Sequence, residues 1–332
     1  MAIEIKGTGL AVPSRRVCND ELPVEINTSD EWIRSHTGIR ARYLAGEETA
    51  ASDLALEAAK KALSASDSAL SLDLIIVTTS TPDFIGCPST ACIVQDKLGA
   101  KQAAAMDISA GCTGFIYALE TAAALLSINN ERKRALVIGS EVLSKFLDWT
   151  DRRTCVLFGD GAGAALLEKT DAPAKGTGKR GLIRTILKAD GSGAEYLVFC
   201  RGGSRSPYKA GETIDKPTHV KMSGRAVYNF AVKALMEIIQ ELLFLEGIGI
   251  NDLDWIVPHQ ANARIIQAAA KRLKIPEEKF FVNIEEYANT SAASIPMALD
   301  ELQRCGKLKQ GNLILSIGFG GGLTYGGNLI VW

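Results

Sequence analysis

Cys112 lies in the segment Ser109-Ala-Gly-Cys-Thr-Gly-Phe115, between an apolar run that ends at Ile108 and an apolar stretch with helical spacing. This order predicts a tight turn from a strand into a helix, with the cysteine at the turn. Small neighbours let a substrate approach closely, and the N–H groups at the start of a helix favour a thiolate. The segment therefore predicts a nucleophile for acyl transfer. A buried, inert cysteine is an equally good interpretation of this segment alone.

His259 is the one of the three histidines whose neighbours indicate a site. It follows the apolar run 256–258 and precedes a helical pattern, and α/β proteins collect functional residues at such strand ends. It is therefore the candidate base beside the cysteine. Taken alone, a histidine that only braces the following helix is the better interpretation.

Three pairs of similar segments recur in the same order along the chain. They are 72–77 with 253–258, 118–120 with 298–300, and 158–163 with 319–322. The first two pairs are about 180 residues apart, and the third requires a deletion. The repeats predict a duplicated unit, with an N-terminal half at 1–172 and a C-terminal half at 173–332. The segment 171–179, which contains proline and glycine, is expected to link the halves.

Asn289 opens a small, polar turn at 289–294 ahead of an apolar helix, and a helix cap is its plain interpretation. The repeats add a second interpretation. Cys112 corresponds to Ala292 at the same spacing, so Asn289 falls within one turn of the symmetry mate of the cysteine's own loop. This relationship predicts that Asn289 shares the site of Cys112. The run Gly320–Gly322 supplies a loop whose backbone can approach a ligand closely, although tight packing would also explain it.

Apolar runs alternate with helical patterns along the chain. Buried strands are expected at 74–78, 104–108, 135–138, 164–167, 256–258 and 313–317, and helices at 49–63, 115–126, 227–245 and 261–273. This alternation predicts an α/β fold with mainly parallel sheets. The long polar segment 200–220 is a candidate lid.

The composition and local patterns exclude several classes of protein. Lys and Arg total 37 against 38 for Asp and Glu, so no broad positive field attracts nucleic acid or an anionic membrane. Seven scattered cysteines without a CxxC pair argue against a disulfide framework or a zinc site, and they favour the cytoplasm. The first residues do not resemble a secretory signal.

Two further segments could mislead. The uncharged stretch 313–332 contains six glycines, so it predicts two strands joined by a glycine loop rather than a membrane helix. Residues 159–164 match the GxGxxG/A dinucleotide fingerprint, but a strand pattern follows where that fingerprint requires a helix. A nicotinamide enzyme is therefore not expected.

Together, the motifs of this chain resemble those of the β-ketoacyl-acyl carrier protein synthase III family. They are SAGCTGF at 109–115, FGDGAGAALL at 158–167, VPHQAN at 257–262, NTSAAS at 289–294 and FGGGLTYG at 319–326, with EWI at 31–33 and TGIR at 37–40. Ordered motifs at matching spacing are far more specific than any one of them. The resemblance implies a duplicated thiolase-like fold, layered α-β-α-β-α with mainly parallel five-stranded mixed sheets, and usually a homodimer.

The activity that the resemblance implies is the decarboxylative Claisen condensation that initiates fatty acid synthesis. Cys112 would take an acetyl, longer or branched acyl group from acyl-coenzyme A. His259 and Asn289 would hydrogen-bond the thioester carbonyl of malonyl-acyl carrier protein and stabilise the enolate that forms as carbon dioxide leaves. Backbone N–H groups of Cys112 and Gly321 would form the oxyanion hole. No metal and no redox cofactor are implied.

The resemblance also implies contacts for coenzyme A. Trp32 and Arg152 would sandwich the adenine, Arg264 would lie near the phosphates and Asn262 near the pantetheine. Each has a plain alternative as a core or solvated side chain. His36 stands where many relatives have arginine, so these contacts are expected to differ in detail.

Two more expectations concern the carrier protein and the primer. Arg264, Lys271 and Arg272 would form a basic patch that receives the acidic carrier protein, although a solvated helix face explains them equally well. Relatives that prefer short primers often have an aromatic residue at position 87, which closes the acyl pocket across the dimer. Cys87 therefore predicts a deeper pocket.

Three alternatives to this activity remain at the level of sequence. One is a related thiolase-fold acyltransferase of secondary metabolism. Another is a cysteine hydrolase that uses Cys112 with His259, against which stand Asn289 and the lack of a clear carboxylate to orient His259. A non-catalytic protein on the same fold would be favoured only if Cys112 were unreactive.

Overall fold

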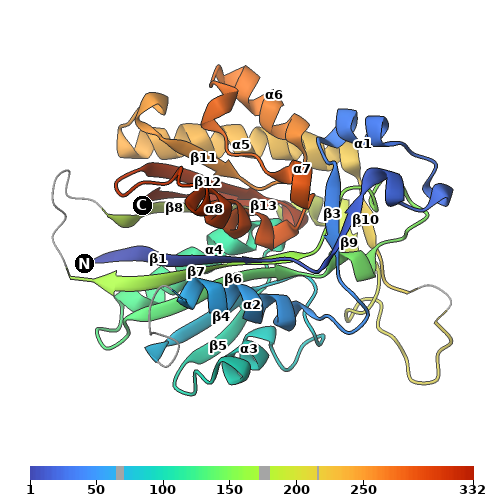
Figure 1. Ribbon diagram of the computed structural model, residues 1–332, viewed down its shortest axis with the longest axis horizontal. Coiled ribbons are helices and arrows are strands. Elements are labelled where there is room, and N and C mark those ends of the chain that lie inside the picture. The colour runs from blue at the N-terminus through green and yellow to red at the C-terminus, as the bar shows by residue number, and fades with distance from the viewer. Residues whose placement is uncertain (65–70, 172–179, 215–216) are drawn as a thin grey trace.

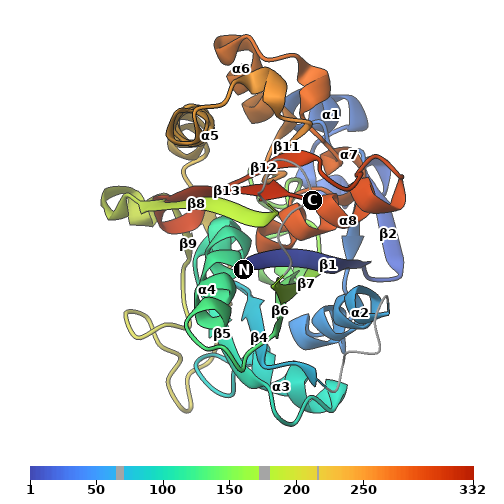
Figure 2. The same cartoon turned by 90° about the vertical axis from the view of Figure 1, so that its left-hand side faces the viewer.

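Two β-sheets and three layers of helices stack in the order α-β-α-β-α (Figures 1 and 2). The computed structural model describes residues 1–64, 71–171, 180–214 and 217–332. From one outer layer to the other, the helices are α2 (Ala51–Leu63) and α3 (Thr90–Leu98), then α4 (Gly114–Ser127) and α8 (Ser294–Arg304), then α5 (Gly224–Glu246) and α6 (Ala263–Leu273). The expected layered α/β fold is confirmed.

The first sheet has five strands in the order β1-β7-β6-β4-β5. Their bounds are β1 (Ala2–Ala11), β7 (Gly161–Thr170), β6 (Arg134–Glu141), β4 (Leu74–Thr78) and β5 (Ala104–Ile108). β4 pairs in parallel with β5 and with β6, whereas β7 pairs antiparallel with β6 and with β1. The carboxyl ends of β4, β5 and β6 therefore meet at one edge, where ligands bind in such sheets.

The second sheet repeats this order in the C-terminal part of the chain. Its described strands, in matching order, are β8 (Gly181–Ala189), β13 (Thr324–Val331), β12 (Leu313–Phe319) and β11 (Trp255–Pro258). Only β11 and β12 pair in parallel. Where the first sheet has β5, the second has a single parallel bridge between Ile256 and Phe280. The same order and the same directions confirm the duplication that the repeats predict.

Two details of the expected fold are wrong. Antiparallel pairs outnumber parallel ones in these two sheets. The sequence does not indicate this, because a strand buried on both faces is apolar whatever its direction. The second sheet has four described strands instead of five, since its fifth position is reduced to the Phe280 bridge. The predicted boundary at 172–173 and residues 172–179 of the predicted linker lie outside the described residues.

The middle helices α4 and α8 are buried between the two sheets. Phe115 and Leu119 of α4 and Leu299 of α8 are fully buried in a core that includes side chains of both sheets. Burial of such a side chain contributes roughly 1.5–3 kcal/mol. A helix that is apolar on most sides requires such a position. This layer fixes the beginnings of α4 and α8. The turn of Cys112 directly precedes α4, and the turn after Asn289 directly precedes α8.

Smaller elements cover one end of the molecule, opposite the two chain termini in Figure 1. They are β2 (Arg15–Cys18), α1 (Asp30–Thr37), β3 (Ala41–Leu44), β9 (Leu197–Phe199), β10 (Val220–Met222) and α7 (Ile284–Tyr287). β12 and β13 confirm that residues 313–332 form two strands, and β7 confirms a strand after the glycine fingerprint. Among the described residues, no helix has the length and apolarity needed to span a membrane.

Candidate active site

Cys112 lies in a single 3₁₀ turn, Gly111–Thr113, between β5 and the start of α4, as its neighbours predict. Its side chain is buried, with 6% of the residue exposed. Gly111 has φ +52°, a backbone conformation that favours glycine, and a Cβ at Gly114 would lie 1.8 Å from Oγ1 of Thr78. The turn therefore depends on small residues at both positions.

The glycine loop after β12 packs directly on the cysteine. A Cβ at Gly320 would lie 2.7 Å from the Cβ of Cys112 and 2.9 Å from its Sγ. The backbone N–H groups of Gly321 and of Cys112 itself are close enough to the sulfur to lower the pKa of the thiol. Two backbone donors thus converge on the place where a thioester carbonyl would meet the nucleophile.

A second 3₁₀ turn, Ser291–Ala293, stands before α8 as the symmetry mate of the cysteine's turn. Asn289 comes just before it and is 6% exposed. Its Oδ1 accepts the N–H of Ser291 at 2.8 Å, and its backbone pairs with Leu157 and Gly159. Because Oδ1 is engaged, the amide Nδ2 is the group left to donate to a ligand.

His259 follows β11 and is 1% exposed. Its Nδ1 lies 2.6 Å from Oγ of Ser294, and its ring meets the edge of Phe319 at a centroid distance of 5.2 Å. Burial lowers the pKa of His259 to about 3. The imidazole is therefore neutral at pH 7.

One cavity of about 170 Å³ brings the three predicted residues together. Cys112, His259 and Asn289 all line it, and Asn262 and Gly320 complete its polar and glycine walls. Burial raises the pKa of the Cys112 thiol to about 11, although hydrogen bonds from Ser291 and from the Gly321 N–H oppose the shift. The thiol is therefore protonated in the free protein near neutral pH, and a reaction with a thioester requires its proton to be removed.

A second cavity, of about 350 Å³, also has Cys112 in its lining. Its apolar walls come from Leu143, Phe158, Leu197, Phe199 and Val220. Three of these residues belong to β9 and β10, the two strands that flank the segment 200–219. The base of the predicted lid therefore forms the wall of a cavity suited to an acyl chain, while residues 215–216 lie outside the described part.

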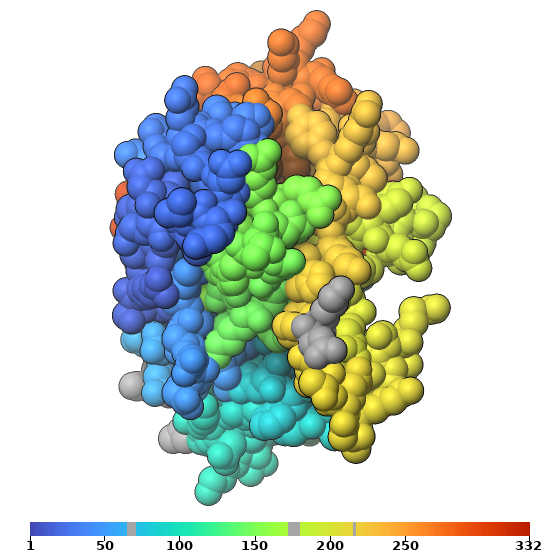
Figure 3. Space-filling model, turned by 90° about the vertical axis from the view of Figure 1, so that its right-hand side faces the viewer, coloured from blue at the N-terminus to red at the C-terminus, as the bar shows by residue number. Residues whose placement is uncertain are grey.

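A larger surface groove, of about 1310 Å³, leads towards these cavities without containing the three central residues. It runs between the segment 148–153 and the residues 194–223, the green and yellow surfaces that lie side by side in Figure 3. The groove shares Phe199 with the second cavity and Met222 with the first. The groove is thus an approach to the cysteine rather than a separate site.

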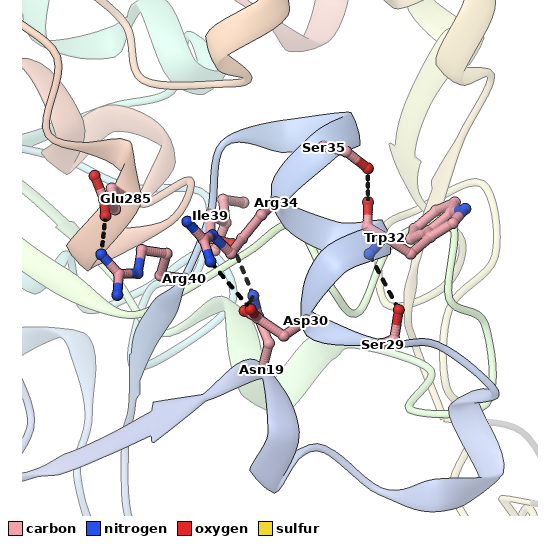
Figure 4. Close-up of polar contacts among 9 residues, drawn as sticks. All are labelled: Asn19, Ser29, Asp30, Trp32, Arg34, Ser35, Ile39, Arg40 and Glu285. Carbon is pink, nitrogen blue, oxygen red and sulfur yellow. Dashed lines mark hydrogen bonds and ion pairs between the residues drawn. The ribbon is translucent and has the colours of Figure 1, made fainter.

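Trp32 and Arg152 meet near this groove. The indole of Trp32 projects from α1, whose start is capped by Ser29 and braced by an Asn19–Asp30 hydrogen bond of 2.8 Å (Figure 4). The Arg152 guanidinium lies 5.4 Å from the indole centroid. The ring of His36 stacks on the indole at 4.4 Å. The structure therefore pairs the two residues predicted to hold adenine, with His36 as an additional partner.

The remaining predicted residues lie at the cavity or on the surface. Asn262 caps α6, where its Oδ1 accepts the N–H of Arg264 at 2.9 Å, and it also lines the cavity of Cys112. Arg264, Lys271 and Arg272 are exposed along α6. Cys87 is exposed, in one segment with Phe84 and Ile85, and it does not line either cavity of its own chain. The structure therefore does not place Cys87 in the acyl cavity of its own chain.

Three polar residues of the site were not identified from the sequence. Ser294 contacts His259, and the Ser291 side chain lowers the pKa of both Cys112 and the buried carboxyl of Glu141. The one available signal for Glu141 was a charged residue three positions after the apolar run 135–138. The two serines belong to the turn NTSAAS, but nothing in the turn shows which side chains face inward.

Comparisons with known proteins place this geometry in a known context. Residues 106–194 match the family model described as 3-oxoacyl-[acyl-carrier-protein (ACP)] synthase III, and residues 243–332 match the model of its C-terminal part. The chain is 48% identical to the β-ketoacyl-[acyl-carrier-protein] synthase III of Syntrophomonas wolfei, across 100% of this chain and 98% of that protein. It is 51% identical to the enzyme of that name from Clostridium perfringens, across 98% of each.

The fold agrees with a solved structure of the same kind. The crystal structure of 3-oxoacyl-[acyl-carrier-protein] synthase III from Aquifex aeolicus matches with a TM-score of 0.89 and 43% identity, across 100% of both chains. Full-length relatives of this name favour the condensing activity over the hydrolase and secondary-metabolism alternatives.

Proposed function

The chain belongs to the β-ketoacyl-acyl carrier protein synthase III family and is an acyltransferase that initiates fatty acid synthesis by decarboxylative condensation, and we propose that Cys112, His259 and Asn289 carry out its chemistry. The substrates in this proposal are an acyl-coenzyme A and malonyl-acyl carrier protein. The observation that supports it best is the single cavity lined by all three residues, with an apolar cavity that the cysteine also lines.

In the first half-reaction, the sulfur of Cys112 attacks the thioester carbonyl of the acyl-coenzyme A. The N–H groups of Cys112 and Gly321 form the oxyanion hole, and their convergence on the sulfur supports this role. Loss of one such donor typically costs roughly 3–4 kcal/mol in the barrier. The acyl chain then lies in the apolar cavity beside Leu197 and Phe199.

In the second half-reaction, malonyl-acyl carrier protein loses carbon dioxide, and negative charge develops on its thioester oxygen. His259 and Asn289 donate hydrogen bonds to that oxygen. A neutral, buried imidazole and a carboxamide with a free Nδ2 suit this role, because donors aimed at a developing charge in a dry site stabilise the transition state more than the ground state. The carbanion then attacks the acyl group on Cys112.

Coenzyme A approaches along the surface groove, with its adenine between Trp32 and Arg152. The present separation of 5.4 Å is shorter than the about 7 Å that two stacking distances require, so Arg152 has to move off the ring when adenine binds. Arg264 serves the phosphates, and Asn262, which lines the cavity, serves the pantetheine. These roles require no metal and no redox cofactor.

The exposed basic residues Arg264, Lys271 and Arg272 on α6 receive the acidic carrier protein in this proposal. The exposed side chains of Phe84 and Ile85 support pairing with a second copy, which would bring Cys87 to the partner's acyl cavity. The free cysteines suit a reducing compartment such as the cytoplasm.

Carbon dioxide release from malonyl-acyl carrier protein tests the proposed chemistry. The wild type with an acyl-coenzyme A should release carbon dioxide and form the 3-ketoacyl product. His259→Ala and Asn289→Ala should each slow this release about 100-fold or more, because each removes one donor to the enolate, yet both should still take the acyl group. Hydrolysis of acyl-coenzyme A without any carbon dioxide release would instead favour the hydrolase alternative.

A further inference from the structure

Near Cys112 lies the buried carboxyl group of Glu141, which has no role in the chemistry proposed above. Glu141 is the last residue of β6 and is fully buried. Its carboxylate accepts the Ser80 N–H at 3.0 Å and the Thr81 hydroxyl at 2.9 Å, and the Thr79 hydroxyl lies at 3.4 Å. Residues 79–81 directly follow β4, so the ends of the parallel strands β4 and β6 meet at the carboxyl group of Glu141. β5, the other parallel neighbour of β4, ends just before the turn of Cys112.

Ser291 connects this carboxyl group to the cysteine. Its turn packs against both β6 and the turn of Cys112, and Ser291 and Cys112 line the same cavity. The Ser291 side chain is close enough to lower the pKa of both Glu141 and Cys112. The turn of Ser291 is pressed against β6, since a Cβ at Gly139 would lie 2.3 Å from the carbonyl oxygen of Ala292. A serine hydroxyl has one proton, so Ser291 donates either to the Glu141 carboxylate, while its oxygen accepts the thiol proton, or to the Cys112 thiolate once that proton has gone.

His259 is poorly suited to take the thiol proton. In the part of the chain that the structure describes, the polar groups that lower the pKa of the Cys112 thiol are the Ser291 side chain and the N–H groups of Gly321 and Cys112, and His259 is not among them. Burial lowers the pKa of His259 to about 3, which makes its imidazole a weak base. Its Nδ1 is also already engaged with Ser294.

We propose that Glu141 is the proton acceptor for Cys112, that Ser291 relays the proton between them, and that Glu141 keeps the proton while the cysteine carries an acyl group. This inference rests on the proposed function. It divides the site into two parts: Glu141 and Ser291 control the proton of the nucleophile, whereas His259 and Asn289 stabilise the enolate.

The proposed proton transfers balance over the whole cycle. During acylation the Cys112 S–H bond breaks, its proton passes to Ser291 Oγ, and the Ser291 hydroxyl proton passes to Glu141. The sulfur forms a bond to the acyl carbon, the bond from that carbon to coenzyme A breaks, and the coenzyme A thiolate takes a proton from solvent. When the carbanion displaces the cysteine, Glu141 returns its proton through Ser291 to the Cys112 thiolate. One solvent proton is thus consumed for each carbon dioxide released.

The electrostatics of the pair support the relay. Burial raises the pKa of Glu141 to about 7, so this carboxyl group can both accept and hold a proton near neutral pH. Glu141 is the charged group that acts on the Cys112 thiol and raises its pKa, whereas the groups that act on Glu141 are the neutral hydroxyls of Thr81 and Ser291 and backbone N–H groups. Moving the proton leaves one negative charge on the pair, so no additional charge is buried.

A purely structural role for Glu141 would be to hold the turn Thr79–Thr81 in place. Asp160 offers a matched control for that possibility. It is also a fully buried carboxyl group, it accepts the N–H groups of Ala45 at 2.7 Å and Ser144 at 2.9 Å, and burial raises its pKa. Cys112 is not among its hydrogen-bond partners. Asp160→Asn therefore makes the same chemical change outside the relay.

The experiment measures the single-turnover rate of Cys112 acylation by acyl-coenzyme A, followed by intact mass, from pH 6 to pH 9.5. In the wild type the rate should rise with pH up to about 7 and then level. Glu141→Gln and Ser291→Ala should each acylate about 100-fold more slowly at pH 7. The deficit should shrink as the pH rises, because the solution then removes the thiol proton directly. The double variant should lose no more than either single variant, because both residues belong to one relay.

Condensation is then measured separately, with enzyme that has first been acylated to completion. Glu141→Gln should slow condensation with malonyl-acyl carrier protein by a smaller factor than acylation, about tenfold or less, since in this half-reaction Glu141 only returns a proton to the departing Cys112 thiolate, which solvent can also protonate. Asp160→Asn should show no pH-dependent deficit in acylation. Ser291→Ala provides the same test if Glu141→Gln does not fold.

Two kinds of result would overturn the relay. Wild-type acylation rates in both Glu141→Gln and Ser291→Ala would do so, and so would a loss that is independent of pH and equal to that of Asp160→Asn. Either result would leave the proposed function intact. A wild type that no acyl-coenzyme A acylates would instead overturn the proposed function, and the relay with it.

Discussion

Nδ1 of His259 lies 2.6 Å from Oγ of Ser294, at the first residue of α8, and the backbone N–H of Gln260 reaches the same oxygen at 3.3 Å. A hydroxyl that accepts the amide can donate its own proton to Nδ1. That arrangement leaves the imidazole proton on Nε2, which is the tautomer that a hydrogen-bond donor to a thioester carbonyl needs.

Ser294→Ala should therefore weaken condensation and spare acylation. Without the hydroxyl, both tautomers of His259 are accessible and the ring is less firmly oriented. We expect condensation to slow about tenfold, which corresponds to roughly 1.4 kcal/mol, while the rate of Cys112 acylation stays near that of the wild type. Equal losses in the two half-reactions would show that Ser294 supports the fold rather than the tautomer. Single-turnover kinetics of each step provide the measurement.

Gly320→Ala should reduce acylation strongly, because its Cβ would enter the space of the Cys112 side chain. The loop must then shift, and the Gly321 N–H moves away from the oxyanion position. We expect a loss of about 100-fold or more, comparable to the loss of one oxyanion donor. Gly191→Ala is the matched control, since a Cβ there meets nothing within 4 Å. Unimpaired acylation in the Gly320 variant would contradict the proposed oxyanion hole.

Glu141 should make the stability of the protein depend on pH. Its pKa is raised by burial from 4.5 to about 7, so the folded chain binds more protons than the unfolded chain between these values. Stability from this group is therefore present below about pH 4.5 and is lost as the pH rises to 7, by up to about 3 kcal/mol. Glu141→Gln removes the effect. Urea unfolding of both proteins measures this effect. From pH 5 to pH 8 the free energy of unfolding of the wild type should fall relative to that of Glu141→Gln. A difference that stays constant would show that the pKa of Glu141 is not raised.

Position 87 should influence which acyl primer is used. Cys87 is exposed on its own chain, so it acts on the pocket of a second copy if it acts at all. An aromatic side chain in its place should shorten that pocket, and Cys87→Phe should then favour acetyl-coenzyme A over branched or longer primers. Competition between primers of different length measures this preference. Unchanged relative rates would remove Cys87 from the acyl pocket.

Much of the scaffold could be predicted because its strands are buried and well bounded. The apolar runs at 74–78 and 104–108 coincide with β4 and β5, since polar or small residues limit each run on both sides. β4 is buried as expected, but the expectation of a buried strand is wrong for β5, an edge strand with Ala104 exposed and the other residues half-buried. Strand direction could not be predicted, because burial on two faces makes parallel and antiparallel strands look alike. The bridge at Phe280 was also unpredictable, since one paired residue leaves no periodic signal.

The site was predictable where the internal symmetry constrained it. The correspondence of Cys112 with Ala292 placed Asn289 beside the nucleophile, and the two 3₁₀ turns have this relationship in the structure. The contacts of Glu141 and Ser291 had no such signal, because they join strands and turns that are far apart in sequence. Such contacts depend on how the layers stack, which local patterns do not encode.

The most direct test of the account is the intact mass of the protein after incubation with acetyl-, isobutyryl- and longer acyl-coenzyme A, with Cys112→Ala as the control. The proposed mechanism predicts one added acyl group on the wild type, none on the control, and a ranking of primers by the extent of addition. An acyl adduct that persists in Cys112→Ala would contradict the assignment of the nucleophile. No adduct with any primer on the wild type would contradict the condensing mechanism itself.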